Sequence, residues 1–129
     1  MFGEPEYAEY FMKKKGAFVP GSFKEKRMYE LEHDGKKIGR CKLEYLLSGW
    51  YLHGFVIQEE YRNQGFGTKF LAQILEALTV PKETSIRTEF TDVFLQVSSR
   101  NRPAVQLYEQ AGFSVSEQRN YYSYRNKKK

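Results

Sequence analysis

The chain has 129 residues, 40% of them hydrophobic and 16% aromatic, which predicts one domain with a buried core and argues against disorder over most of its length. Its formal net charge is +5, and the lysines at positions 127–129 supply three of these charges, so the charge does not require a nucleic acid as partner. The single cysteine excludes an internal disulfide, and no apolar run approaches the roughly 18 residues of a membrane span.

The first ten residues are acidic and lack the apolar stretch of a signal peptide. We therefore expect a cytoplasmic protein with no membrane partner, formed by a single domain over residues 1–129. The two histidines and one cysteine show no ligand spacing, so no metal site is expected.

The N-terminal segment predicts a short helix. Residues 4–15 would bring Tyr7, Tyr10 and Phe11 to one side of that helix. The following stretch contains Pro20 and Gly21, which would end it.

A hairpin is expected next. Residues 27–33 alternate as a strand, and Asp34-Gly35 fits a two-residue turn, because both central positions of a type I′ turn need positive φ. The return strand covers residues 36–47. Its core face would carry Cys41, Leu43, Tyr45 and Leu47.

Residues 50–57 predict the central strand, whose two faces are both largely apolar, as in a strand covered on both sides. One face would carry Tyr51, His53, Phe55 and Ile57, and the other Trp50, Leu52, Gly54 and Val56. A turn with two glycines follows and leads into a helix over residues 65–78. This turn would lie at a helix N-terminus, where free backbone N–H groups and the helix dipole favour a phosphate.

The second half predicts a strand over residues 92–97 and a helix from Arg102, with Pro103 in its first turn and Gly112 as its stop. Residues 113–117 and 121–124 would form two closing strands joined around Arg119-Asn120. The element order predicts an α/β (α+β) fold, a mixed and largely antiparallel twisted sheet with helices on both faces.

Two motifs suggest a function. Residues 62–67 read R-x-x-G-x-G, which lacks both the G-x-x-x-x-G-K-[ST] of nucleoside triphosphatases and the third glycine of the dinucleotide fingerprint. Residues 101–113 read N-x-x-A-x-x-L-Y-E-x-x-G-F, after a strand and at the start of a helix. In this order and at this separation, the pair resembles the signature of the GNAT superfamily, the N-acyltransferases that use acetyl-CoA. The resemblance covers about residues 28–125.

The resemblance implies where acetyl-CoA would bind. The central strand and the next strand would splay apart, and the pantetheine arm would lie in the gap between them. Its backbone contacts would fall on Phe55, Val56 and Ile57, and Asn101 would add a side-chain contact. The pyrophosphate would rest on the N–H groups of Asn63, Gln64, Gly65, Phe66, Gly67 and Thr68, with Arg62 opening the turn. The structural alternatives are core packing for Phe55 and Ile57, and an ordinary helix N-cap for Asn101.

Catalytic roles also follow from the resemblance. Tyr108 would protonate the departing thiolate, its alternative being a core tyrosine, and a backbone N–H near Ile57 would stabilise the tetrahedral intermediate. His53 would be the general base, directly or through water, against the alternative of a hydrogen-bonded sheet histidine. The branch that includes serotonin N-acetyltransferase has histidines twelve and fourteen residues before the first motif glycine, and these positions are His53 and Tyr51 here. Ribosomal-protein N-terminal acetyltransferases instead have a glutamate five positions before the motif asparagine; here that position is Gln96, which cannot take a proton.

Three other residues have side chains that could take part in proton or acyl transfer. Glu44 is a secondary candidate base, with an exposed strand carboxylate as the alternative. His33 is expected to be an ordinary strand-end residue. Cys41 has no motif neighbours that would activate a thiolate for a covalent intermediate. The resemblance implies direct transfer in a ternary complex, which is the usual route of the GNAT superfamily.

The resemblance thus implies a transferase that moves an acyl group, acetyl by default in this family, from acyl-CoA to a primary amine. The acceptor remains open among a polyamine, an amino-sugar drug, a peptide N-terminus and a lysine, and the oligomeric state, including a homodimer, is also open. The alternative is a CoA-binding sensor or interaction domain without catalysis. A nucleic-acid-binding role, which would predict strong salt dependence, ranks third.

Overall fold

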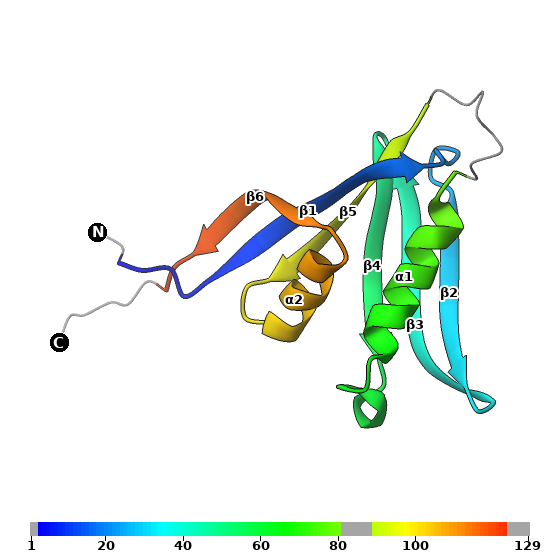
Figure 1. Ribbon diagram of the computed structural model, residues 1–129. Coiled ribbons are helices and arrows are strands. Elements are labelled where there is room, and N and C mark those ends of the chain that lie inside the picture. The colour runs from blue at the N-terminus through cyan, green and yellow to red at the C-terminus, as the bar shows by residue number, and fades with distance from the viewer. Residues whose placement is uncertain (1–2, 81–88, 124–129) are drawn as a thin grey trace.

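The computed structural model describes residues 3–80 and 89–123, which form one six-stranded sheet in the order β2-β3-β4-β5-β1-β6 together with two α-helices (Figure 1). All neighbouring strands are antiparallel except β4 and β5, which are parallel, so the predicted mixed and largely antiparallel sheet is confirmed. No helix in the described part of the chain is long and apolar enough to cross a membrane. In chain order the elements are β1 (Tyr7–Phe18), β2 (Lys26–His33), β3 (Lys36–Leu46), β4 (Gly49–Ile57), the 3-10 turn η1 (Glu59–Tyr61), α1 (Phe66–Leu78), β5 (Thr91–Ser98), α2 (Arg102–Gln110) and β6 (Ser114–Tyr121).

The N-terminal segment is a strand, so the predicted helix over residues 4–15 is wrong. Strand β1 pairs with β5 on one side and with β6 on the other, so the backbone groups of β1 have hydrogen-bonding partners along most of the strand. Its residues Ala8 and Met12 are buried, and Met12 belongs to the core cluster that includes residues of both helices. The helical spacing of its aromatic residues is overridden by these pairings with strands far along the chain.

The β2–β3 hairpin is confirmed. Asp34 and Gly35 both have positive φ, at 51° and 78°, as the type I′ turn requires. On β3, Cys41 and Leu43 are fully buried, but the prediction of Leu47 as a core residue is wrong. Leu47 lies in the turn after β3 with a φ of 23° and is 88% exposed.

Strand β4 contains a β-bulge that corrects its predicted faces. Arg40 pairs with Val56 and Lys42 with His53, so Cys41 alone stands opposite both Gly54 and Phe55. Because a strand alternates its side chains with period two, one extra residue exchanges the faces beyond that point. Phe55 and Ile57 therefore join the buried face of Trp50 and Leu52, whereas Tyr51 and His53 point to the opposite face.

Both helices cover the same face of the sheet, as Figure 1 shows. The ring of Phe55 contacts Phe70 of α1 at 5.5 Å and Tyr108 of α2 at 6.1 Å between centroids, so one side chain touches both helices. The expectation of helices on both faces therefore differs from the structure, in which the described residues place no helix on the other side. We call this uncovered side the open face.

The C-terminal segment forms one strand where two were predicted. Strand β6 runs through Arg119 and Asn120, the proposed turn, because both residues pair with β1. Tyr122 and Ser123 lie outside any strand, and Tyr124 is outside the described residues.

The position of β1 inside the sheet can be tested by a core deletion. Met12 is 1% exposed and pairs with Leu95 and Val115, so Met12→Ala should lower the free energy of unfolding by about 2–4 kcal/mol. Lys15→Ala, an exposed position on the same strand, is the matched control and should change it by less than about 0.5 kcal/mol. Denaturant titration measures both, and equal small losses would contradict the placement of β1.

Candidate functional site

The site begins where β4 and β5 stop pairing. Their parallel register comprises Gly49 with Asp92, Trp50 with Val93, and Tyr51 with Phe94. Beyond these residues β4 continues to pair with β3 and β5 with β1, but in the described structure β4 and β5 no longer pair with each other. The gap between them opens at the carboxyl ends of two parallel strands, the position where open α/β sheets bind ligands.

The backbone of β4 offers hydrogen-bonding groups to this gap. The Gln58 N–H donates to the Ile38 carbonyl at 2.7 Å, and an antiparallel ladder alternates its bonded pairs, so Val56 turns its backbone groups toward β3. Phe55 and Ile57 turn theirs toward the gap. The Ile57 carbonyl accepts a hydrogen bond from Arg62 Nε at 2.8 Å, whereas its N–H remains directed at the gap.

The loop before α1 has the shape of an anion site. Gly65 is the N-cap of α1 with a φ of 86°, and no side chain caps the helix there. Asn63, two residues earlier, also has a positive φ of 62°. The first N–H groups of α1 therefore have no intrahelical or capping partner and lie at the positive end of the helix dipole.

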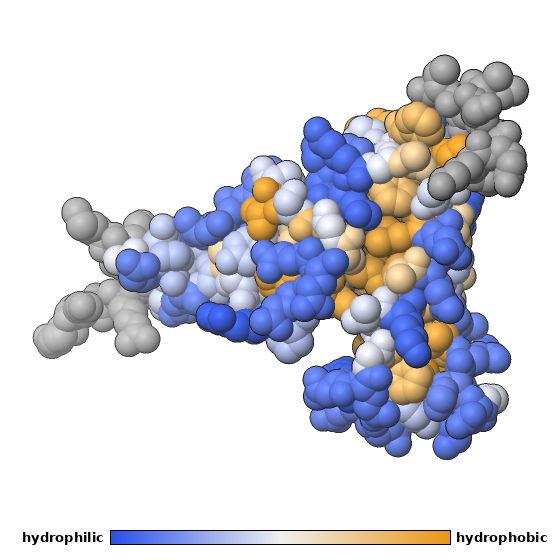
Figure 2. Space-filling model, viewed as in Figure 1, coloured by the Kyte–Doolittle hydropathy of each residue, from blue (hydrophilic) through white to orange (hydrophobic). Residues whose placement is uncertain are grey.

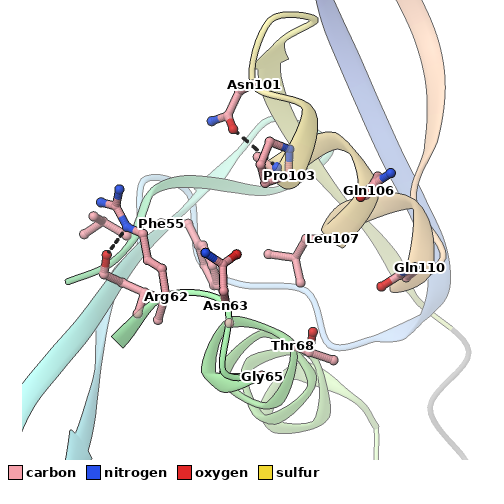
Figure 3. Close-up of a pocket in the computed structure, with 14 residues that line it drawn as sticks. Phe55, Arg62, Asn63, Gly65, Thr68, Asn101, Pro103, Gln106, Leu107 and Gln110 are labelled. Carbon is pink, nitrogen blue, oxygen red and sulfur yellow. Dashed lines mark hydrogen bonds between the residues drawn. The ribbon is translucent and has the colours of Figure 1, made fainter. Parts of the chain in front are cut away.

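A groove of about 600 Å³ joins the gap to this loop (Figures 2 and 3). In Figure 2 it is the hollow between α2 and the loop preceding α1. Most of the predicted donor-binding residues line it, namely Phe55, Val56, Ile57, Arg62, Asn63, Gly65, Gly67, Thr68 and Asn101. Gln64 and Phe66 do not: the Gln64 side-chain amide donates to the Glu60 carbonyl, and the Phe66 ring packs on His33 and Tyr61.

One wall of the groove was missed by the sequence analysis. Pro103, Ala104, Gln106, Leu107 and Gln110 of α2 line it, and in Figure 3 Leu107 points across it toward α1. The spacing of positions 103, 107 and 110, which places them on one side of a helix, was the available signal. Asn101 is the N-cap of α2, since its Oδ1 accepts from the Ala104 N–H at 3.3 Å, and it lines the groove as well.

Gly67 lies at the base of the groove in the first turn of α1. A Cβ atom built there would stand 3.7 to 3.9 Å from side-chain atoms of Leu107, Ile57 and Phe55. These are ordinary contact distances, so the backbone tolerates a side chain at this position. A longer side chain would occupy the space between the two helices.

Tyr108 is buried behind Phe55 and does not line the groove. It is 7% exposed, and its ring packs against Phe55 and Phe113. Burial, with a smaller contribution from the nearby Cys41, raises the pKa of the phenol to about 12. Tyr108 therefore keeps its proton at neutral pH, as a proton donor must.

Cys41 stands opposite the bulge of β4 and is fully buried. Its thiol can donate to two backbone carbonyl oxygens, that of Lys42 at 3.6 Å and that of His53 at 3.8 Å from the sulfur. Burial raises its pKa to about 12, so almost no thiolate exists near neutral pH. This environment disfavours a covalent intermediate on Cys41.

His53 and Tyr108 lie on opposite sides of the sheet, with the backbone of β4 between them. The His53 ring stacks on Tyr51 at 5.3 Å with 19° between planes. It faces a second cavity, of about 360 Å³, which we call the open-face hollow. This hollow is lined by Lys26, Arg27, Met28, Lys42, Leu43, Glu44 and His53.

The remaining residues weighed from the sequence have structural partners. Gln96 Nε2 donates to Glu9 Oε1 of β1 at 3.1 Å. His33 ends β2 and packs edge-on against Phe66 at 4.7 Å, so it supports the loop before α1 from behind. The described residues contain no group of three or more His, Cys, Asp or Glu side chains placed to hold a metal ion.

The chain resembles known proteins in sequence and in fold. A family model described as "Acetyltransferase (GNAT) domain" matches residues 24–115. A solved GCN5-related N-acetyltransferase from Sphaerobacter thermophilus matches the structure with a TM-score of 0.59 at 12% sequence identity, which concerns the fold alone. That match covers 89% of this chain and 50% of the other, so the chain spans half the length of that structure. No curated protein matches the chain significantly. Residues 24–115 include both motifs, the gap and the uncapped helix, and the chain belongs to the GNAT acetyltransferase family.

Proposed function

We propose that the protein transfers an acetyl group from acetyl-CoA to a primary amine, directly and in a ternary complex. The observation that carries this proposal is the groove, which joins the uncapped N-terminus of α1 to the gap between β4 and β5. A ligand with a diphosphate at one end and an extended amide-bearing arm at the other matches both parts of the groove.

The donor would bind along the groove. The pyrophosphate would accept hydrogen bonds from the N–H groups of the loop before α1, and the guanidinium of Arg62 would add positive charge. Arg62 is held by its Nε on the Ile57 carbonyl, which leaves its terminal nitrogens for an anion. The pantetheine amides would pair with the backbone groups of Phe55 and Ile57 that face the gap.

The thioester would then lie in the gap near Phe55. Attack of a neutral amine on its carbonyl carbon forms a tetrahedral oxyanion, which the gap-facing N–H groups of Phe55 and Ile57 would stabilise. Collapse of this intermediate breaks the carbon–sulfur bond, and the Tyr108 phenol would give its proton to the leaving thiolate. Tyr108 packs on the Phe55 ring, which supports this assignment.

The amine would approach from the open face. His53 lies on that side, two residues beyond Tyr51, the last residue of β4 that pairs with β5. It would take the proton of the acceptor ammonium directly or through water, with Glu44 of the same hollow as the second candidate base. The donor and the acceptor would thus reach the gap from opposite sides of the sheet.

The competing function is acyl-CoA binding without catalysis, as in a sensor or interaction domain. One observation favours it, since neither Tyr108 nor His53 lines the groove. Against it, both residues flank the segment of β4 that forms the edge of the gap. Thiol release in the presence of an amine separates the two functions.

Donor binding can be tested at Gly67. Gly67→Leu should weaken acetyl-CoA binding by about tenfold or more in calorimetric titration, because the side chain enters the groove between Leu107, Ile57 and Phe55. Gly3→Leu is the matched control, since a Cβ there meets nothing within 4 Å, and its affinity should equal that of the unchanged protein. Absence of binding by the unchanged protein would overturn the proposed function. If the unchanged protein, Gly67→Leu and Gly3→Leu bound acetyl-CoA with equal affinity, the donor would bind outside the groove.

Tyr108→Phe should lower kcat by about 100-fold, because it removes the proton for the thiolate, and should leave acetyl-CoA affinity within about twofold. Tyr45→Phe is the control, as it removes a hydroxyl whose hydrogen bond to Thr91 lies away from the groove. Initial rates of thiol release and calorimetry provide the two readouts. An unchanged kcat would eliminate Tyr108 as the acid.

His53→Ala should cost about tenfold or more in kcat/KM near pH 6.5, where the amine is almost entirely protonated and needs a base. The loss should shrink as the pH approaches the pKa of a primary amine, about 10, because the acceptor is then increasingly deprotonated without a base. A pH profile of both proteins between these limits checks this. A loss of constant size would assign His53 to packing against Tyr51 instead.

A further inference from the structure

The open-face hollow carries a pattern of charges set by strand register. Lys42 of β3 stands directly opposite His53 of β4 and opposite Met28 of β2. Lys26 of β2 stands opposite Glu44 of β3. Directly paired residues point to the same face of a sheet, with Cβ atoms about 5 Å apart, so these five side chains border one cavity.

The two ammonium groups of the hollow are uncommitted. None of the ion pairs in the described residues involves Lys26, Lys42 or Glu44, although Lys26 and Glu44 are register partners. Lys26 and Lys42 are exposed, and Arg40, two residues along β3, is exposed as well. Glu30, the register partner of Arg40, is already paired with Lys37 at 3.2 Å.

The two lysines outnumber the one unpaired carboxylate that the described residues place in the hollow, Glu44, so an excess of positive charge remains beside His53. A second ammonium group of a polyamine would meet two lysines against that one carboxylate and would be repelled on balance. A carboxylate or phosphate would instead gain two charge-assisted contacts. Met28, 59% exposed, adds an apolar wall next to Lys42 for a short alkyl chain.

The residue that follows His53 on β4 carries no side chain. Gly54 follows His53 at the bulge with a φ of 63°, and a Cβ atom built on it would meet nothing within 4 Å. The space between His53 and the gap is thus free of side chains at this residue. Neighbouring strands lie about 4.8 Å apart, so the hollow extends about 5 to 10 Å from β4 to the lysines of β3 and β2.

We propose that the acceptor is an amine that also carries an anionic group, a carboxylate or a phosphate, held by Lys42 and Lys26 while the amine lies beside His53. This inference rests on the proposed function, because it specifies the acceptor of that reaction. It selects against unsubstituted diamines and polyamines.

The test uses three series of primary amines with matched chain lengths of two to six carbons: ω-amino carboxylates, aminoalkyl phosphates and diamines. Thiol release from acetyl-CoA is measured for each amine with the unchanged protein and with the double variant Lys26→Glu, Lys42→Glu. Lys15→Glu, the same charge reversal at an exposed position on β1 outside the hollow, is the control. Calorimetric titration of acetyl-CoA accompanies each protein.

We expect at least one anionic series to exceed the diamines of equal length by about tenfold in kcat/KM. The double variant should lose that preference through a higher KM with kcat within about threefold, while Lys15→Glu retains it. The better of the two anionic series identifies the group. Equal turnover of all three series, a preference for diamines, or no turnover of either anionic series would overturn the inference. If the inference fails while any of the three series, the diamines included, releases thiol, the proposed function still stands. Binding of acetyl-CoA without thiol release from any series would remove both the inference and the proposed transfer, and would leave the binding-only function.

Discussion

The early end of pairing between β4 and β5 is the constraint on which the rest of the site depends. After Tyr51 the two strands part, and within three residues β4 inserts its bulge at Gly54. The bulge exchanges the faces of the strand, so Phe55 contacts both helices while His53 remains on the open face. A regular β4 would place both side chains on one side, and the core under α1 and α2 would lose the ring of Phe55.

This geometry makes the sheet a partition between two cavities of different character. On the helix side, the groove ends at an uncapped helix N-terminus whose backbone donors suit phosphate oxygens. On the open face, lysine side chains beside His53 create a more adaptable charged surface. Backbone groups in the first cavity are fixed by secondary structure, whereas the side chains in the second can vary without changing the fold.

Sequence reasoning succeeded where structure is determined locally. The Asp34-Gly35 turn, the glycine turn before α1 and the start of α2 at Asn101 each carry their signal within a few residues, and each lies where it was predicted. Most of the residues between Phe55 and Thr68 that the family resemblance assigned to the donor line the groove, while their binding of acetyl-CoA stays a prediction. The roles predicted for Tyr108 and His53 stay predictions, since geometry fixes their positions and not their chemistry.

Sequence reasoning failed where pairing between strands that are distant in the chain determines the local structure. The aromatic spacing of residues 4–15 favours a helix, and only pairing with β5 and β6 makes that segment a strand. The face exchange in β4 depends on one extra residue opposite Cys41, which alternation of apolar residues in β4 alone does not reveal. The pairing of Lys42 with His53 likewise required the register of β3 on β4.

The place of β1 has a consequence for how the molecule is made. The partners of β1 lie far along the chain. On the β6 side, the Ser116 hydroxyl donates to the Phe11 carbonyl, 105 positions away. On the β5 side, the Ser99 N–H donates to the Ala8 carbonyl. During synthesis β1 leaves the ribosome well before either neighbour exists, so its backbone stays hydrated while β2, β3 and β4 can already form their meander. Such non-local closure slows folding. The first strand of the chain can take its place between β5 and β6 only after both have been made, and that pairing joins the two halves of the sheet.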